Sequence, residues 1–136
     1  MSCVFCGIIE GATPASVVMR DDDVVAFLDA RPLFKGHVLV LPRAHVVTLA
    51  DLPTPLVPAL FGVVQRMSRA VADACGAEGS FVALNNVVSQ SVPHLHVHVV
   101  PRKKGDGLKG FFWPRTKYAS DDERAAYADK IAAAFK

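Results

Sequence analysis

The chain has 136 residues, of which 51% are hydrophobic and 21% are charged, a composition typical of one packed domain rather than a disordered chain. Its 15 Lys and Arg residues against 13 Asp and Glu residues give a net charge of +2, which argues against a dedicated nucleic-acid-binding protein. No run of about 18 apolar residues predicts a membrane span, and the first residues do not resemble a signal peptide. We therefore expect a cytoplasmic protein that has neither nucleic acid nor a membrane as a partner.

Five strands and two helices are predicted in chain order. Turn signals separate the five β-rich runs, which cover residues 16–20, 24–28, 37–41, 80–86 and 92–100. The first helix is predicted to start at Pro55, after Thr54 as its N-cap, and to stop at Gly76. The second helix is predicted to follow a capping box that Ser120 opens. Strands that do not alternate regularly with helices predict an α+β fold, here as a single domain over 1–136 with a C-terminal extension from about residue 101.

The most informative segment contains three histidines at alternate positions, His94, His96 and His98. On an extended chain this alternation places the three imidazoles on one face and the aliphatic residues between them on the other face. A lone histidine is usually a satisfied or merely exposed side chain. Three imidazoles on one face pack poorly and must share a cavity, so their arrangement favours a functional site.

Two kinds of chemistry suit such a face. Imidazoles can bind Zn, Fe or Cu, but no Asp or Glu lies between Glu78 and Asp106 to complete a typical catalytic metal centre. A neutral imidazole is also a competent nucleophile near pH 7. The segment around the histidines favours a phosphorylated substrate, because hydroxyl and amide donors precede them and a basic stretch follows. The basic residues are Arg102, Lys103, Lys104, Lys109, Arg115 and Lys117.

The alternating segment from His94 to Val100 resembles the motif that names the histidine-triad (HIT) superfamily. Similarity extends over most of the chain, and its other parts are Cys3 to Ile9, Asp21 to Asp29, Gly36 to His45, and Gln90 to Val92. The combination resembles the Hint branch in its bacterial form, which begins with a C-x-x-C pair. The resemblance implies the HIT fold, with a five-stranded antiparallel sheet and two helices, and a homodimer whose sheets join into ten strands.

The same resemblance implies a nucleotidyl hydrolase or transferase that acts on purine nucleotides, especially nucleoside 5′-phosphoramidates. His96 would attack the α-phosphorus and form a covalent nucleotidyl-histidine, which water then resolves. His98 would contact the α-phosphate and assist the leaving group, and His37 would support the histidine face. No cofactor would be required for this chemistry.

The resemblance also implies which residues bind the substrate. Phe27, Asp29 and Ala30 match positions that line the base and ribose pocket, and either Asn85 or Asn86, together with Gln90 and Ser91, matches the loop that holds ribose and phosphate. From the residues alone, Phe27 fits a core position as well as it fits a base pocket. Asp29 likewise fits a turn as well as it fits a ribose contact. The loop from Val87 to Gln90 is short and lacks the glycines usual in relatives.

A structural zinc site is implied by the paired cysteines. Cys3 and Cys6 supply two thiolates, and His45 and His94 match the two imidazole ligands of relatives with paired cysteines. Such a closed Cys2His2 site would tie the N-terminus to the sheet, and it would remove His94 from the catalytic set. The third cysteine, Cys75, is expected to be a buried small apolar residue.

Two alternative functions stay open at this point. One is a dinucleoside polyphosphate hydrolase of the Fhit type, against which the paired cysteines and Gln90-Ser91 argue. The other is a non-catalytic, nucleotide-binding regulatory protein, against which the intact histidine motif argues. Trp113 is either a residue that shapes the choice of leaving group near a partner's pocket or a surface aromatic.

Overall fold

The structure, a computed structural model, describes residues 3–108 and 115–136. The chain forms two compact units, Met1–Asp106 and Gly107–Lys136. Lys109 and Trp113, both singled out from the sequence, lie outside the described residues. Within the described part of the chain, no helix is long and apolar enough to cross a membrane.

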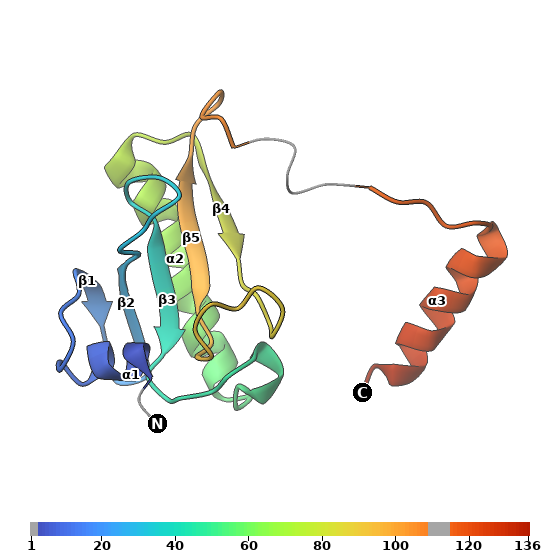
Figure 1. Ribbon diagram of the computed structural model, residues 1–136, viewed down its shortest axis with the longest axis horizontal. Helices are drawn as coiled ribbons and strands as arrows, with labels where there is room; N and C mark the ends of the chain where they lie inside the picture. The colour runs from blue at the N-terminus through green and yellow to red at the C-terminus, as the bar shows by residue number, and fades with distance from the viewer. Residues whose placement is uncertain (1–2, 109–114) are drawn as a thin grey trace. The chain divides into compact units, whose positions relative to one another are not determined.

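The first unit is built on one antiparallel sheet of five strands (Figure 1). The strand order is β1-β2-β3-β5-β4, and the strands are β1 (Val17–Arg20), β2 (Val24–Leu28), β3 (Val38–Pro42), β4 (Gly79–Ala83) and β5 (Val97–Arg102). The β1–β2 turn closes because the Asp21 side chain accepts hydrogen bonds from the backbone N–H groups of Asp23 and Val24, both at 2.8 Å. The predicted five-stranded antiparallel sheet is confirmed.

The helix α2 (Leu56–Cys75) covers one face of the sheet (Figure 1). Its apolar residues, spaced three and four apart, form its buried stripe, and they are Leu60, Val63, Val64, Met67 and Val71. Gly76 ends the helix in the left-handed conformation, with φ of 62°, as predicted. The helix begins one residue later than predicted, because residues 53–57 first form a turn in which Leu56 N–H donates to Pro53 O and Val57 N–H to Thr54 O.

The short helix α1 (Val4–Ile9) lies on the opposite face and was not predicted. It has only six residues, too few to show a helical period in the sequence. The Cys3 thiol caps it by accepting a hydrogen bond from Cys6 N–H at 3.5 Å. Phe5, Ile8 and Ile9 form a second core cluster with four residues of β2 and β3, which are Val25, Phe27, Leu39 and Leu41.

The fifth strand differs from its predicted range of 92–100. It begins at Val97, because the residues before it do not bond to a neighbouring strand: Leu95 N–H donates to Val46 O in the loop after β3 at 2.7 Å, and His94 N–H donates within its own segment to Val92 O at 2.8 Å. Only His98 of the three histidines therefore lies in a strand. The predicted alternation holds nonetheless, because Leu95, Val97 and Val99 are buried in the cluster that packs under α2.

The second unit contains the helix α3 (Asp121–Ala134). The predicted capping box is present at its start: the Ser120 hydroxyl accepts a hydrogen bond from Glu123 N–H at 3.1 Å, and the Glu123 carboxylate accepts one from Ala119 N–H at 2.8 Å.

Candidate active site and metal site

Three histidines meet at the face of the sheet that α1 covers. His37 precedes β3, His98 lies in β5, and these strands pair directly. His37 Nε2 lies 2.9 Å from His98 Nδ1, and the ring centroids of His96 and His98 are 5.0 Å apart. The ring of Phe5 packs edge-on against His96 with centroids 5.0 Å apart, so α1 forms one wall of this cluster.

The three histidines line a cavity of about 930 Å³, a volume within the range of small-molecule sites. The cavity brings together seven residues singled out from the sequence, which are Phe27, Asp29, Ala30, His37, Ser91, His96 and His98. Phe27 serves both the core and the cavity, because it is 2% exposed and packs against Phe5 with ring centroids 5.4 Å apart.

Three predicted binding residues are not part of this cavity lining: Asn85, Asn86 and Gln90. Their side chains hold loops together instead. The Asn86 side chain accepts from Leu49 N–H at 2.8 Å, and the Asn85 amide donates to Ser89 O at 3.2 Å. The Gln90 side chain accepts from Val87 N–H at 3.0 Å and donates to Val47 O at 2.6 Å.

Sequence reasoning missed several residues that line the cavity. Val4, Phe5 and Ile8 come from the unpredicted helix α1, and Lys35 comes from the loop before His37. Arg102, Lys103 and Lys104, which the sequence suggested for phosphate, do not line this cavity. The sequence shows only that Lys35 directly precedes Gly36 and His37. A single lysine in a loop does not by itself predict a binding site.

The hydrogen bonds of His96 define its tautomer. Its Nδ1 lies 2.7 Å from the carbonyl oxygen of His94. Because a carbonyl can only accept, Nδ1 carries the proton and donates. In the neutral imidazole the second nitrogen, Nε2, therefore keeps its lone pair.

His37 and His98 form a chain of hydrogen bonds with a defined direction. Leu33 N–H donates to His37 Nδ1 at 3.1 Å, so the proton of neutral His37 lies on Nε2. That nitrogen donates to His98 Nδ1, which leaves the proton of neutral His98 on its own Nε2. The Asp29 carboxylate lies 3.7 Å from His37 Nε2.

Burial keeps this pair of histidines neutral. Desolvation lowers the pKa of His37, an effect that the Asp29 charge opposes and His96 reinforces. Desolvation, followed by the nearby His96 and His37, lowers the pKa of His98 to about 4. At neutral pH His98 is therefore a neutral hydrogen-bond donor at Nε2.

We expect that, in the His98→Gln variant, the free energy of unfolding falls less steeply as the pH is lowered than it does in the wild type. The folded pKa of about 4 lies below the ordinary value of 6.5, so between these values the unfolded chain binds more protons and the free energy of unfolding falls as pH falls. One such group contributes at most about 1.4 kcal/mol per pH unit. Urea unfolding of both proteins from pH 4 to 8 measures the difference. Above pH 7 the free energy of unfolding should change with pH equally in the two proteins. Equal changes below pH 6.5 as well would contradict the expectation.

Four metal-ligating side chains gather beside the histidine cluster, namely Cys3, Cys6, His45 and His94, with their ligand atoms all within 4.8 Å of one another. His94 Nδ1 lies 3.7 Å from Cys3 Sγ, 3.6 Å from Cys6 Sγ and 3.2 Å from His45 Nδ1, and Cys6 Sγ lies 3.4 Å from His45 Nδ1. A tetrahedral ion with bonds of about 2.0–2.3 Å holds its ligand atoms roughly 3.3–3.8 Å apart. These residues can therefore hold a zinc ion.

The second nitrogen of His94 supports this arrangement. His94 is fully buried, and its Nε2 lies 2.8 Å from the carbonyl oxygen of Pro42. The carbonyl accepts, so Nε2 carries the proton and Nδ1 presents its lone pair to the two thiols and His45. Burial raises the pKa of the Cys6 thiol, and the adjacent Cys3 raises it further.

Comparison with known proteins identifies the family. The HIT domain matches residues 10–105, which include all the histidines of both sites. The chain belongs to the HIT family. The resemblance found in the sequence and the HIT fold are thereby confirmed, and the close pairing of Cys3 and Cys6 in the structure agrees with the paired-cysteine form.

Three HIT relatives illustrate the similarity. Adenosine 5′-monophosphoramidase hnt1 of Schizosaccharomyces pombe is 30% identical over 138 residues that cover 100% of both chains. Adenylylsulfatase HINT3 of Arabidopsis thaliana is 37% identical over 108 residues, 78% of this chain and 55% of that protein. A Zn-bound histidine triad family protein from Mycobacterium smegmatis has a TM-score of 0.75 at 38% identity, and the match covers 98% of each chain.

Proposed function

We propose that this HIT protein is a nucleotidyl hydrolase or transferase that cleaves purine nucleoside 5′-phosphoramidates or related nucleotide conjugates. The observation that carries the proposal is the bond from His96 Nδ1 to the His94 carbonyl, 2.7 Å long. It leaves the lone pair of His96 Nε2 available within a cavity large enough for a nucleotide. Two relatives support the substrate class by their names, one as an adenosine 5′-monophosphoramidase and the other as an adenylylsulfatase.

The reaction proceeds in two displacements at the α-phosphorus. His96 Nε2 forms a bond to phosphorus while the bond from phosphorus to the leaving nitrogen breaks. His98 Nε2–H donates a hydrogen bond to that nitrogen, which takes a proton from solvent and departs as the amine. In the second step a water oxygen attacks phosphorus, the electron pair of the breaking bond returns to His96 Nε2, and the proton that water loses goes to solvent. His37 and Leu33 N–H position His98 through the directed chain of hydrogen bonds.

The rest of the cavity supplies substrate contacts. We propose that Asp29, whose side chain is 23% exposed, accepts hydrogen bonds from the ribose hydroxyls. Phe27 and Ala30 line the space for the base, while Ser91 and Lys35 supply a hydroxyl and a positive charge for the phosphate. Asn85, Asn86 and Gln90 do not contact the substrate in this proposal; their side chains hold the loop that carries Ser91 in place.

Rapid-quench mass spectrometry with adenosine 5′-phosphoramidate tests the proposal. We expect a transient AMP adduct on the peptide that contains His96, followed by free AMP. Parallel reactions with adenylyl sulfate and a diadenosine polyphosphate rank the leaving groups. Faster turnover of the diadenosine compound would instead favour the dinucleoside polyphosphate hydrolase, and AMP binding without any turnover would favour a regulatory protein.

We further propose that the metal site holds one structural zinc ion. Two thiolates and two imidazoles would complete a tetrahedral shell without an open position, which is the pattern of a structural site. Zinc would tie α1 to the loop after β3 and to the segment before β5, because these carry the four ligands. The ion would thereby keep Phe5 against His96.

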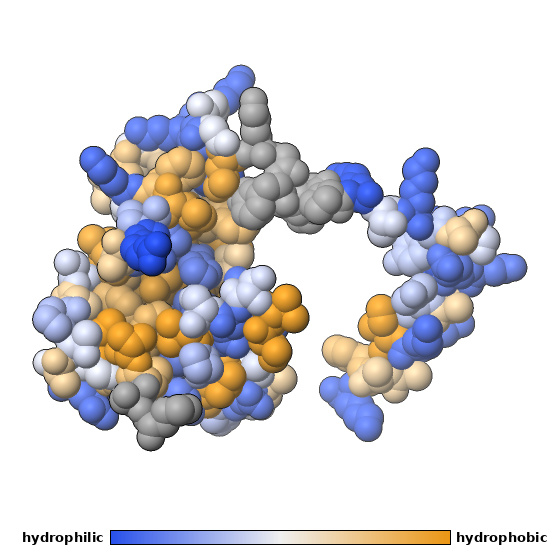
Figure 2. All heavy atoms as spheres, viewed as in Figure 1, coloured by the Kyte–Doolittle hydropathy of each residue, from blue (hydrophilic) through white to orange (hydrophobic). Residues whose placement is uncertain are grey.

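A homodimer is proposed from the sheet edge. The β4 strand is the last in the sheet order, and its Val82 is 42% exposed, one of several apolar side chains at the surface of this unit (Figure 2). A strand at the edge of a sheet can pair with a second copy, which would give ten strands. Light scattering should give about twice the chain mass of 14.6 kDa, and a mass of one chain would contradict the dimer.

A further inference from the structure

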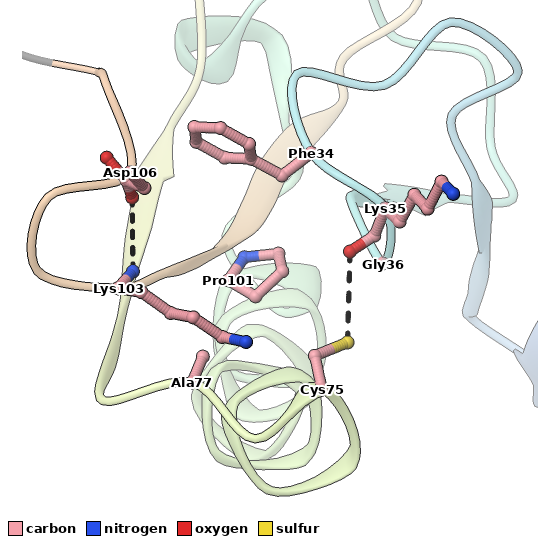
Figure 3. A pocket seen from close by; sticks show the side chains of 8 residues that line it. All are labelled: Phe34, Lys35, Gly36, Cys75, Ala77, Pro101, Lys103 and Asp106. Atoms are coloured by element: carbon pink, nitrogen blue, oxygen red, sulfur yellow. Dashed lines mark hydrogen bonds between the residues drawn. The ribbon is translucent and has the colours of Figure 1, made fainter.

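A second cavity, of about 470 Å³, lies on the other side of the loop that precedes His37. Figure 3 shows the side chains around it. They come from that loop, from the end of α2, from the turn after it, and from the end of β5 and the loop that follows. The lining residues are Phe34, Lys35, Gly36, Cys75, Ala77, Pro101, Lys103 and Asp106. None of them is a proposed catalytic or metal residue, and Lys35 is the one that also has a proposed substrate contact in the nucleotide cavity.

Gly36 makes this cavity possible by letting the loop approach α2. Its φ is +98°, and a Cβ at this position would clash with Cys75 Sγ and lie 3.3 Å from the Pro101 ring. The Cys75 thiol donates to Lys35 O at 3.9 Å (Figure 3). Cys75 is therefore half-buried at a cavity wall, rather than the buried small apolar residue expected from the sequence.

The walls of the cavity are mainly apolar. Figure 3 shows the rings of Phe34 and Pro101 and the Ala77 methyl group around the open space. Pro101 is buried, whereas Phe34 is half-buried and has no aromatic partner among residues 3–108 and 115–136. Phe34 therefore offers the cavity an aromatic ring against which a planar ligand ring can pack.

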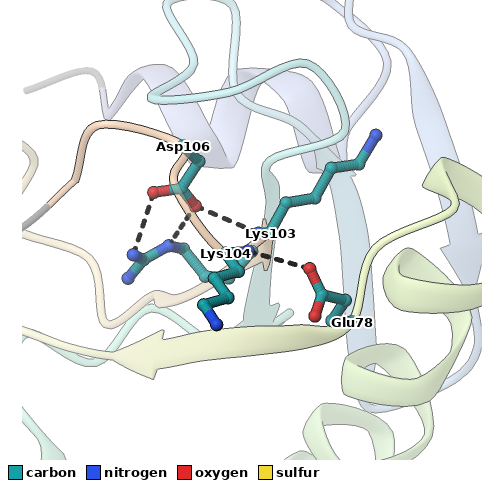
Figure 4. Close-up of polar contacts among 5 residues, drawn as sticks. Glu78, Lys103, Lys104 and Asp106 are labelled. Atoms are coloured by element: carbon teal, nitrogen blue, oxygen red, sulfur yellow. Dashed lines mark hydrogen bonds and ion pairs between the residues drawn. The ribbon is translucent and has the colours of Figure 1, made fainter.

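The charges around the cavity favour an anion. The Asp106 carboxylate is already engaged by the Arg102 guanidinium, at 2.5 and 3.0 Å, and by Lys103 N–H at 3.1 Å (Figure 4). The Glu78 carboxylate accepts from Lys104 N–H at 2.9 Å. The Lys103 ammonium forms no ion pair with any described residue, and its side chain extends along the cavity toward Cys75 (Figure 3).

We propose that this cavity is a binding site for a small aromatic carboxylate, separate from the nucleotide site. The ring of the ligand packs against Phe34 and Pro101, and its carboxylate binds the Lys103 ammonium. Lys35 also lines the cavity, but its ammonium is directed away from Pro101 and Cys75 (Figure 3). The single cation that faces the apolar wall, Lys103, matches one negative charge on a planar body rather than the several charges of a nucleotide. The volume of 470 Å³ is within the range of small-molecule sites.

The two cavities share a wall, because Lys35 and Gly36 line both. His37 N–H donates to Phe34 O at 3.0 Å, so the residue that contacts the aromatic ligand also belongs to the turn that carries His37. The wall separates the ligands, and both can be bound at the same time.

Calorimetric titration of the full-length protein with indole-3-carboxylate tests the proposal. We expect saturable binding to the wild type and binding at least about tenfold weaker for indole-3-carboxamide, which lacks the charge. Lys103→Met should weaken indole-3-carboxylate binding by a similar factor. Lys104→Met is the matched control, because Lys104 is adjacent, has the same charge and does not line the cavity, and its affinity should stay within about twofold of the wild type.

A second measurement locates the probe in the cavity. Indole-3-carboxylate should slow the alkylation of Cys75 by iodoacetamide, followed by peptide mass spectrometry, and its affinity should not change when AMP is present at saturating concentration. Competition with AMP would place the probe in the catalytic cavity and overturn the proposal. Absence of binding, or equal effects of the Lys103 and Lys104 replacements, would overturn it as well.

Discussion

His96→Ala is expected to lower the rate of turnover of adenosine 5′-phosphoramidate by at least about a thousandfold. The replacement removes the nitrogen that would bond to phosphorus, and no other described residue presents an unprotonated imidazole nitrogen into this cavity: His98 Nδ1 accepts from His37, and its Nε2 carries the proton. AMP affinity should fall by no more than a few fold, because Asp29, Ser91 and Lys35 are unchanged. Steady-state kinetics and AMP titration measure the two effects.

Two control variants make this result specific. His96 is 5% exposed, so its loss leaves a cavity, and His96→Gln fills most of that space while still lacking the nucleophilic nitrogen. Both variants should lose the AMP adduct. Lys104→Met, at a position that does not line the cavity, should keep the wild-type rate. A rate for His96→Gln within tenfold of the wild type would contradict the role of His96 as nucleophile.

Removal of the metal site is expected to have the largest effect on stability. Protein purified without chelators should contain about one zinc ion per chain by elemental analysis, and Cys6→Ser should lose most of it. Without the ion nothing covalent holds α1 to His45 and His94, and the melting temperature should fall by at least about 10 °C. Absence of zinc from both proteins would contradict the site.

The third cysteine provides the matched control for the zinc experiment. Cys75 is half-buried like Cys3 and Cys6 but is not among the four clustered ligands. Cys75→Ser should therefore keep its zinc and its melting temperature within a few degrees. In Cys6→Ser the activity should also fall, because Phe5 on α1 packs against His96.

Local patterns in the sequence predicted much of the fold. The turn acids between β1 and β2, Gly76 at the end of α2 and the Ser120 capping box each act through bonds to residues a few positions away, so their effect does not depend on the rest of the chain. The alternation around His94, His96 and His98 likewise predicted which side chains share a face. The helix α1 escaped prediction, since six residues become helical here with the help of the Cys3 cap and the packing of Phe5, Ile8 and Ile9.

The candidate site could be described only by combining the sequence with the tertiary structure. The histidine motif predicted the chemistry and the resemblance predicted the metal ligands, because these depend on residue type and spacing. The roles of Asn85, Asn86 and Gln90 could not be predicted in the same way, because their amides bond to backbone groups as distant as Val47 and Leu49. A side-chain amide suits a loop and a ligand equally well, and only the approach of other segments decides between them.

By itself, the sequence determined the order of the strands along the chain, the face shared by the three histidines and the family. Tertiary structure alone decided which ring nitrogen of His37, His94 and His96 carries the proton. That choice depends on the acceptors and donors that folding brings to each ring: the carbonyl of His94 for His96, Leu33 N–H for His37 and the carbonyl of Pro42 for His94. The sequence cannot tell which of the two nitrogens of a neutral imidazole carries the proton. The hydrogen bond that one nitrogen makes in the folded chain fixes the protonation of the other.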